Sequence, residues 1–402
     1  MREGRGRRGS TFLVLYPPPL VIDFSRLAAR LGEFSAYQRE EQERHARRLE
    51  MARACLDECA PEWEALAARV GKAGRGPLRA VPLARPDLRQ TAPPRPPTVT
   101  VVATDGSQIF PDRHADPACF LLNVGRVALH YGTLDPPLLA AEPDFRFHTD
   151  ELADLAPDDP DVPDATAEVV SALRDEQELA WLHTTARDER KSGREIVALA
   201  DGTLIRWMLR GMKNRGLEER LLARYVAILD RFREDGIPLA SYISKPGAAE
   251  VVNTLRLHRG EGDWDRGPES LFGLHDRHLF EEVLETGERS AVFASRSEVL
   301  QSYGDHAVVA FYVRLGTEVG RVEMPRWAAE VPGWLDLVHA VILDQAEKGG
   351  GYPIILQEAH ERAVVRVEER EMFFRLLQGR LRRDGLASAA SAKGGSKRAP
   401  RV

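Results

Sequence analysis

Two short motifs place a carboxylate directly after an apolar stretch of the chain. Asp105-Gly106-Ser107 follows residues 98–104, TVTVVAT, and Asp201-Gly202-Thr203 follows residues 195–200, EIVALA. Such stretches favour buried strands, and Asp-Gly favours a turn where a strand ends. A carboxylate beside a core is costly without a partner, and a divalent cation is one such partner. An Asx turn explains either motif alone, but the repeated layout favours a shared site at one end of a sheet.

Two further residue types with suitable chemistry lie elsewhere in the chain. A helix expected over 165–191 carries Glu176 and Glu178, and a late helix carries His360, eight residues after Tyr352. Most helical glutamates are solvated charges, and a lone helical histidine is usually a packing residue. Together with the two aspartates, however, these residues suit phosphodiester hydrolysis by two cations about 3.5–4 Å apart. Hard oxygen ligands favour Mg²⁺ or Mn²⁺, and one imidazole shifts the preference toward Mn²⁺.

The remaining pattern predicts a mixed α/β domain that would position these groups. No element is assigned to the charged segment 258–290, and the acidic, proline-rich segment 134–166 is interpreted as a surface loop. The elements expected after the first strand are a strand at 119–131 with a bulge at Gly125, the helix at 165–191, a strand at 195–201, a helix at 204–234, a strand at 239–244, a helix at 248–257, a hairpin of 307–315 and 319–324, and helices at 328–347 and 354–381.

Composition and charge limit the class of protein. The 402 residues are 43% apolar and 29% charged, with a net charge of −6, so the chain is not a globally basic nucleic-acid binder. No run of about 18 apolar residues exists, which predicts no membrane span. Three cysteines fit a reducing compartment, and we expect a cytoplasmic protein. The expected divisions are a flexible basic arm (1–23), a helical region broken at Pro61 (24–72), a Pro/Gly/Arg linker (73–97), the catalytic domain (98–381) and a disordered basic tail (382–402).

Three motifs together resemble the NurA family of DNA-repair nucleases. They are ATDGSQ (103–108), ALADGTL (198–204) and GYPIILQEAHERA (351–363), and the last is the most specific. The resemblance covers 98–381 and implies an RNase H-like mixed sheet flanked by helices. It also implies an Mn²⁺-dependent nuclease, with Mg²⁺ as the alternative and two ions per site. Such enzymes cut single- and double-stranded DNA as 5′→3′ exonucleases and endonucleases. They form homodimers and work with the hexameric ATPase HerA in the resection of DNA ends.

Carried over residue by residue, the resemblance implies roles for the groups introduced above. Asp105, Asp201, Glu178 and His360 would hold metal, and Tyr352 would contact the substrate or support the site. The family shows an arginine four residues before the helix carboxylate, as Arg174 precedes Glu178, whereas helical periodicity favours Glu176. The cations expected to contact the DNA backbone, from their positions in the chain, are Lys245, Arg206 and Arg362.

Two other functions remain open at the level of the sequence. Actin-like ATPases share this fold and its Asp-Gly turns, but they need later glycine-rich turns between strand and helix. The candidates, Gly349–Gly351 and the glycine pair at 394–395, are not at such positions. A NurA-like subunit that has lost activity and only regulates a HerA-type ring is the second alternative. The intact Asp-Gly motifs, Tyr352 and His360 disfavour it.

Overall fold

The computed structural model describes residues 24–110, 119–147, 166–191, 193–210, 212 and 214–386. The chain forms two compact units, Met1–Arg47 and Arg48–Val402. The described part of the first unit is the N-terminal portion of helix α1 (Phe24–Cys59). The basic arm expected at 1–23 lies outside the described residues, as does most of the tail expected at 382–402.

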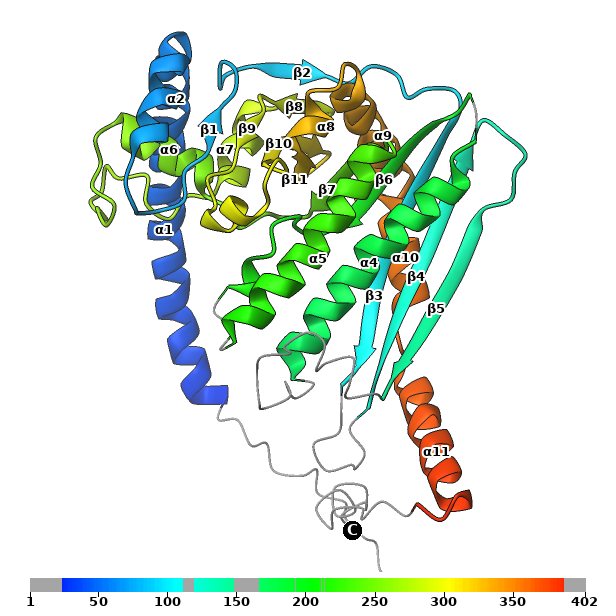
Figure 1. The fold of residues 1–402 in the computed structure, drawn as a ribbon. Coiled ribbons are helices and arrows are strands. Elements are labelled where there is room, and N and C mark those ends of the chain that lie inside the picture. The colour runs from blue at the N-terminus through cyan, green and yellow to red at the C-terminus, as the bar shows by residue number, and fades with distance from the viewer. Residues whose placement is uncertain are drawn as a thin grey trace, which may run out of the picture. The chain divides into compact units, whose positions relative to one another are not determined.

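One mixed sheet runs through the second unit (Figure 1). Its central strands lie in the order β7-β6-β3-β4-β5. Strand β4 is antiparallel to both β3 and β5, whereas β6 is parallel to β3 and β7 is parallel to β6. This mixed order, with helices on both faces, is the RNase H-like core that the sequence predicts. The bounds of these strands are β3 (Val99–Ile109), β4 (Phe120–Tyr131), β5 (Leu138–Arg146), β6 (Glu195–Asp201) and β7 (Leu239–Ile243).

Further strands extend the sheet beyond β7. They are β11 (Glu318–Pro325), β10 (Val308–Leu315), β9 (Phe293–Ala294), β8 (Glu288–Ser290), β1 (Val81–Pro82) and β2 (Arg89–Thr91). Strands β1 and β2 belong to the segment 73–97, which we expect to be a linker, so part of that segment also contributes to the sheet. Backbone hydrogen bonds fix the position of this segment. The Ala80 amide donates to the Glu250 carbonyl, and the Leu83 amide donates to the Val292 carbonyl.

Helices cover both faces of the central strands (Figure 1). Helices α4 (Ala167–Glu189) and α5 (Arg215–Glu234) pack on one face, and α9 (Trp334–Lys348) and α10 (Ile354–Ala363) pack on the other. Successive side chains of β3 point to opposite faces of the sheet and so pack in both hydrophobic cores. Val102 faces α4, whereas Val101 and Ala103 face α9 and α10. A third core joins residues after Arg47 of α1 to α2 (Trp63–Lys72), α6 (Glu250–His258) and α7 (Asp276–Val283).

Several element boundaries differ from those expected from the sequence. The helix expected at 204–234 begins only at Arg215, after the short 3-10 helix η2 (Trp207–Leu209). The helix expected at 354–381 is two helices, α10 and α11 (Val367–Arg383), and the helix expected at 328–347 is likewise divided. The helical region at 24–72 breaks at Pro61, as predicted. The remaining short helices are η1 (Ala60–Glu62), η3 (Glu298–Ser302) and α8 (Arg326–Ala329).

Strand β5 occupies part of the segment that we interpreted as a surface loop. It pairs with β4 along Leu138–Arg146, and Pro143 lies opposite Asn123. As the last strand in the order of the sheet, β5 tolerates this proline, because an edge strand leaves some of its amides unpaired. Half-buried and exposed residues alternate along it. The loop prediction is therefore wrong for these nine residues.

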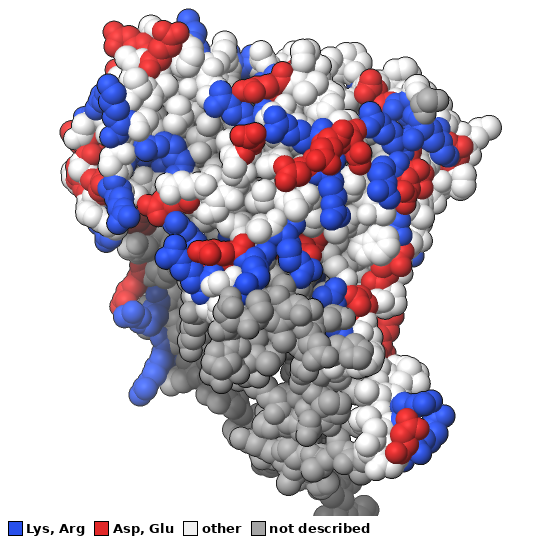
Figure 2. Space-filling view, viewed as in Figure 1, with Lys and Arg blue, Asp and Glu red and all other residues white. Residues whose placement is uncertain are grey.

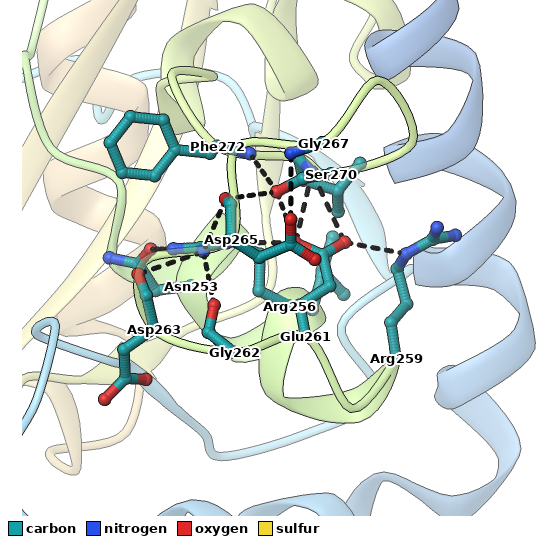
Figure 3. Close-up of polar contacts among 12 residues, drawn as sticks. Asn253, Arg256, Arg259, Glu261, Gly262, Asp263, Asp265, Gly267, Ser270 and Phe272 are labelled. Atoms are coloured by element: carbon teal, nitrogen blue, oxygen red, sulfur yellow. Dashed lines mark hydrogen bonds and ion pairs between the residues drawn. The ribbon is translucent and has the colours of Figure 1, made fainter.

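The first part of the unassigned segment 258–290 forms ion pairs and hydrogen bonds around Arg256 of α6 (Figure 3). The buried guanidinium of Arg256 donates to the Glu261 carboxylate over 3.0 Å and to the Gly262 carbonyl over 2.9 Å. Glu261 also accepts a hydrogen bond of 2.9 Å from the Ser270 hydroxyl. The charges thus order this loop, and the rest of the unassigned segment contains α7 and β8. None of the described helices is long and apolar enough to cross a membrane.

Candidate active site

Asp105 lies in the middle of a strand rather than in a turn. Strand β3 continues to Ile109, and Asp105 pairs with Gly125 of β4, so the turn predicted at 105–107 is wrong. Thr104 donates to the Glu178 carbonyl of α4, and the next side chain therefore points to the opposite face. There the Asp105 carboxylate lies 2.7 Å from His360 Nδ1 on α10.

Gly125 sets the position of the helix that carries His360. No bulge occurs at Gly125, which pairs with both neighbouring strands. A β-carbon at this position would lie 2.4 Å from the Ala359 carbonyl oxygen, so only glycine lets the α10 backbone approach β4 this closely. The end of the helix is then fixed by the Ala363 carbonyl, which accepts hydrogen bonds from Ser107 and from Asn123.

Asp201 ends strand β6 on the same face of the sheet as Asp105. Its Oδ1 accepts a hydrogen bond of 3.1 Å from the Tyr352 hydroxyl, and the Tyr352 ring packs edge-on against Tyr242. The following Gly202 has a φ of +77°, so this second Asp-Gly does form the predicted turn. Removal of water from around its carboxyl raises the pKa of Asp201, and the Tyr352 hydrogen bond opposes that shift.

Glu178 reaches the site from α4 through the gap left by Gly106. A β-carbon on Gly106 would lie 2.3 Å from Glu178 Oε1. Burial raises the pKa of Glu178 to about 8, with repulsion from Asp175 and Asp105 adding to the shift and Arg174 opposing it. The Arg174 Nε lies 2.9 Å from Glu178 Oε1. Of the two candidate glutamates, Glu178 thus lies beside Asp105.

Glu176 points away from this site. Its Oε1 lies 2.7 Å from Arg224 on α5, where it forms an ion pair between the two helices. The helical stripe that favours Glu176 in the sequence is therefore the stripe that packs on α5, whereas the active-site face of α4 is set by its contact with β3.

The five candidate residues come together from four separate segments of the chain. Asp105, Asp201 and Glu178 bring three carboxylates, and their partners are His360, the Tyr352 hydroxyl and Arg174, respectively. These oxygen and imidazole donors are of the types that suit Mn²⁺ or Mg²⁺. In this arrangement, no three His, Cys, Asp or Glu side chains of the described residues are placed to share one metal ion. The donor chemistry fits a divalent cation, and its binding requires the side chains to draw closer.

The segment that contains this site matches a known protein family. Residues 99–365 match the family model described as NurA domain. The chain belongs to the NurA family. The crystal structure of the NurA nuclease from Sulfolobus solfataricus is similar at 16% identity and a TM-score of 0.44, over 79% of this chain and 90% of that chain. No curated protein matches this chain.

The three cations expected to contact DNA differ in accessibility within this NurA-family fold. Lys245 and Arg362 are exposed, although Lys245 Nζ lies 2.8 Å from Glu318. Arg206 is half-buried, donates to Asp175 over 2.9 Å and stacks on Tyr225. Contacts of all three with DNA stay predictions, and Arg206 is the least accessible. On the face viewed in Figure 1, Figure 2 shows basic side chains mixed with acidic ones, without an extended basic patch over the described residues.

Sequence reasoning missed two residues that support the NurA-family site. Glu323 of β11 is buried, and its Oε2 accepts hydrogen bonds from the Thr203 hydroxyl (2.8 Å) and the Leu204 amide (2.9 Å). It therefore fixes the turn after Asp201. Charged residues in an otherwise apolar strand are the signal that could have indicated this role. Gly106 is the other residue, and its role depends on a contact with α4 that no local pattern shows.

Gly349–Gly351, considered in the sequence as a phosphate-binding turn of an ATPase, do not lie between a strand and a helix. Gly349–Gly351 connect α9 to α10, so they form a turn between helices rather than one between a strand and a helix. The pair at 394–395 lies outside the described residues. The phosphate-binding turns of an actin-like ATPase are therefore not formed by Gly349–Gly351.

Proposed function

We propose that this NurA-family protein is a metal-dependent deoxyribonuclease. The observation that carries the proposal is that Asp105 in β3 and Asp201 at the end of β6 each contact one residue of the 351–363 motif, His360 and Tyr352, while Glu178 lies against Gly106. Membership of the NurA family supports it, because the three motifs that resemble the family of DNA-repair nucleases contain four of these five residues.

His360 and Asp105 are in direct contact in the candidate site. A proton on His360 Nδ1 makes the 2.7 Å contact a hydrogen bond to Asp105, which fixes the imidazole ring and leaves Nε2 free to bind a ligand. The Tyr352 hydroxyl orients Asp201 in the same way by donating to its Oδ1. In each aspartate, therefore, one carboxylate oxygen is oriented by a hydrogen bond, from His360 to Asp105 and from Tyr352 to Asp201.

Glu178 supplies a carboxyl group whose charge depends on its surroundings. Its pKa of about 8 means that it holds a proton near neutral pH unless positive charge is added beside it. We propose that Asp105, Asp201, Glu178 and His360 hold Mn²⁺, or Mg²⁺, as two ions. When bound, these ions lower the pKa of water and stabilise the charge that develops on the phosphodiester oxygens.

The finer features of the function follow from family membership as proposals. The protein would act as a 5′→3′ exonuclease and single-strand endonuclease in the resection of DNA ends for recombinational repair. It would form a homodimer, accept single- and double-stranded DNA and work with a HerA-type hexameric ATPase. A regulatory subunit without activity is the competing function, and a cleavage assay separates the two.

The test is cleavage of end-labelled DNA by the purified protein with Mn²⁺, Mg²⁺ or EDTA. Glu178→Gln and Glu176→Gln form a matched pair, because both glutamates lie on α4 and only Glu178 lies beside Asp105. We expect metal-dependent cleavage that Asp105→Asn and Glu178→Gln abolish and Glu176→Gln retains. The position of the label gives the polarity. No cleavage with any metal, even after a HerA-type ATPase is added, would favour the regulatory subunit.

A further inference from the structure

A cavity of about 360 Å³ lies beside the candidate active site, on the side of α6. Its walls come from the turn after β6, the loop between β7 and α6, and the start of α6. The residues most relevant to its chemistry are Thr203, Trp207, Ile243, Ala249 and Asn253. The cavity is large enough for a planar ring system the size of a nucleobase, and most of its lining is apolar.

Two residues in the wall of the cavity are close in the chain to residues of the proposed site. Thr203, in its wall, is two residues beyond Asp201. Ile243, also in its wall, follows Tyr242, whose ring contacts Tyr352, so the cavity and Tyr352 lie on opposite faces of β7. The carboxyl ends of parallel strands, here β6 and β7, are where open α/β sheets bind ligands. A strand of DNA that crosses this end of the sheet, with one phosphodiester at Asp201, therefore has a neighbouring nucleotide on the side of the cavity.

The charges around the cavity disfavour an anionic occupant. The first amides of α6 are taken, because Val251 and Val252 both donate to the Asp276 carboxylate. The Arg321 guanidinium in the wall is also taken, by the carboxylates of Glu250 and Glu323 at 2.8 and 2.9 Å. Two carboxylates against one guanidinium leave no positive charge for a phosphate among the described residues of the wall. The occupant that fits is neutral.

Trp207 gives the cavity an aromatic surface. It belongs to η2, is 41% exposed, and its amide donates to the Ile205 carbonyl over 2.9 Å. Nucleobases stack on exposed aromatic rings without regard to sequence, which is how many proteins hold single strands. A half-exposed tryptophan in an apolar cavity whose described lining offers no free cation therefore matches a base rather than a backbone phosphate.

We propose that this cavity binds one base of the substrate strand, stacked on Trp207, next to the phosphodiester that is cut. The base leaves the helical stack to enter, so the cavity favours single-stranded DNA or the frayed end of a duplex. Lys245 adjoins the wall at Pro246 and is 69% exposed, which places a cation outside the cavity, in an exposed ion pair with Glu318 that a backbone phosphate would have to replace. The inference rests on the proposed function, because it assigns part of the substrate of that site.

The test measures the contribution of bases to binding by fluorescence anisotropy. A labelled single strand of about 16 nucleotides is compared with the same strand carrying abasic residues, with EDTA present to keep both intact. The variants are Trp207→Ala, Trp207→Phe and, as the matched control, Met208→Ala. Met208 is the neighbour of Trp207 on η2, is 74% exposed and is not part of the cavity wall.

We expect the wild type to bind the strand with bases on the order of tenfold more tightly than the abasic strand. Trp207→Ala should reduce this preference several-fold, Trp207→Phe should restore most of it, and Met208→Ala should leave it unchanged. An undiminished preference in Trp207→Ala would overturn the inference while leaving the nuclease proposal intact. Failure of the wild type to bind or cut any DNA would overturn both.

Discussion

The Glu178 carboxylate occupies the space that a side chain at Gly106 would need. The glycine lies within strand β3, and a β-carbon added to it would lie 2.3 Å from Glu178 Oε1 and 2.8 Å from Arg174 Cγ. The missing side chain lets a carboxylate from α4 reach Asp105 past the end of β6. In this Asp-Gly pair, Asp105 thus places a carboxylate on one face of the strand, and Gly106 leaves room for the Glu178 side chain on the other face.

We therefore expect Gly106→Ala to impair catalysis more than folding. The methyl group displaces the Glu178 carboxylate, and the cleavage rate should fall by a factor of about ten or more, since misplacement by about 1 Å is enough for a large loss. The loss of unfolding free energy should be about 1–3 kcal/mol, as for other overpacked sites. Gly71→Ala is the control, because no described atom lies within 4 Å of that added methyl group. Wild-type cleavage by Gly106→Ala would contradict this role.

Gly125→Ala should affect the face of the sheet that α10 covers, and its main effect should be a loss of stability. The added β-carbon would lie 2.4 Å from the Ala359 carbonyl, and α10 must move away from the sheet because a backbone atom cannot rotate aside. We expect the free energy of unfolding, from urea denaturation, to fall by about 1–3 kcal/mol. The cleavage rate should fall too, because His360 moves with α10.

Gly379→Ala in α11 provides the comparison for that experiment. No described atom lies within 4 Å of its added methyl group, so the substitution should leave stability unchanged or raise it by about 0.5–1 kcal/mol. Equal effects of the two substitutions would show that α10 does not depend on close approach at Gly125.

The same glycines show how far the sequence alone predicts this site. The apolar runs predict β6 at its observed bounds, and the two aspartates do lie on adjacent parallel strands, although only Asp201 ends its strand. The conformation of Asp-Gly is not predicted, because it depends on neighbours far away in the chain. Gly202 forms a turn at a φ of +77°, whereas Gly106 stays extended because it pairs with Val124 of β4.

The choice between the two helix glutamates illustrates the same limit. Periodicity identifies the stripe of α4 that packs on α5, and Glu176 lies there in an ion pair with Arg224. The active-site face of α4 is decided by the contact between Thr104 and the Glu178 carbonyl, which joins residues 74 positions apart. A local pattern carries no information about such a contact, so the resemblance to a family was the better guide to Glu178.

Removal of the Arg321 charge should be among the most destabilising changes in the molecule. Arg321 is 4% exposed and lies between the buried carboxylates of Glu250 and Glu323. Arg321→Met leaves two uncompensated carboxylates in the interior, and we expect a loss of about 3–5 kcal/mol in unfolding free energy. The triple variant Arg321→Met, Glu250→Gln, Glu323→Gln should recover part of this loss. A triple variant no more stable than Arg321→Met would show that packing, rather than charge, sets the cost.

His339 should make stability fall as the solution becomes acidic. Its ring is fully buried, and burial together with repulsion from Arg289 lowers its pKa from 6.5 to about 4, against a hydrogen bond to the Gly287 carbonyl. Between those values the unfolded chain binds the proton and the folded chain does not, so stability rises with pH across this range. Between about pH 7.5 and about pH 5 the loss from this group should be about 2 kcal/mol.

The measurement for His339 is urea denaturation at both pH values, with His339→Gln compared to the wild type. The variant is less stable at either pH because it disturbs a packed site, but its loss on acidification should be smaller by about 2 kcal/mol. His258→Gln, on α6, tests whether any histidine substitution has this effect. An acid dependence in His339→Gln as steep as that of the wild type would assign the loss to other groups, among which the carboxylates of the active site would be examined next.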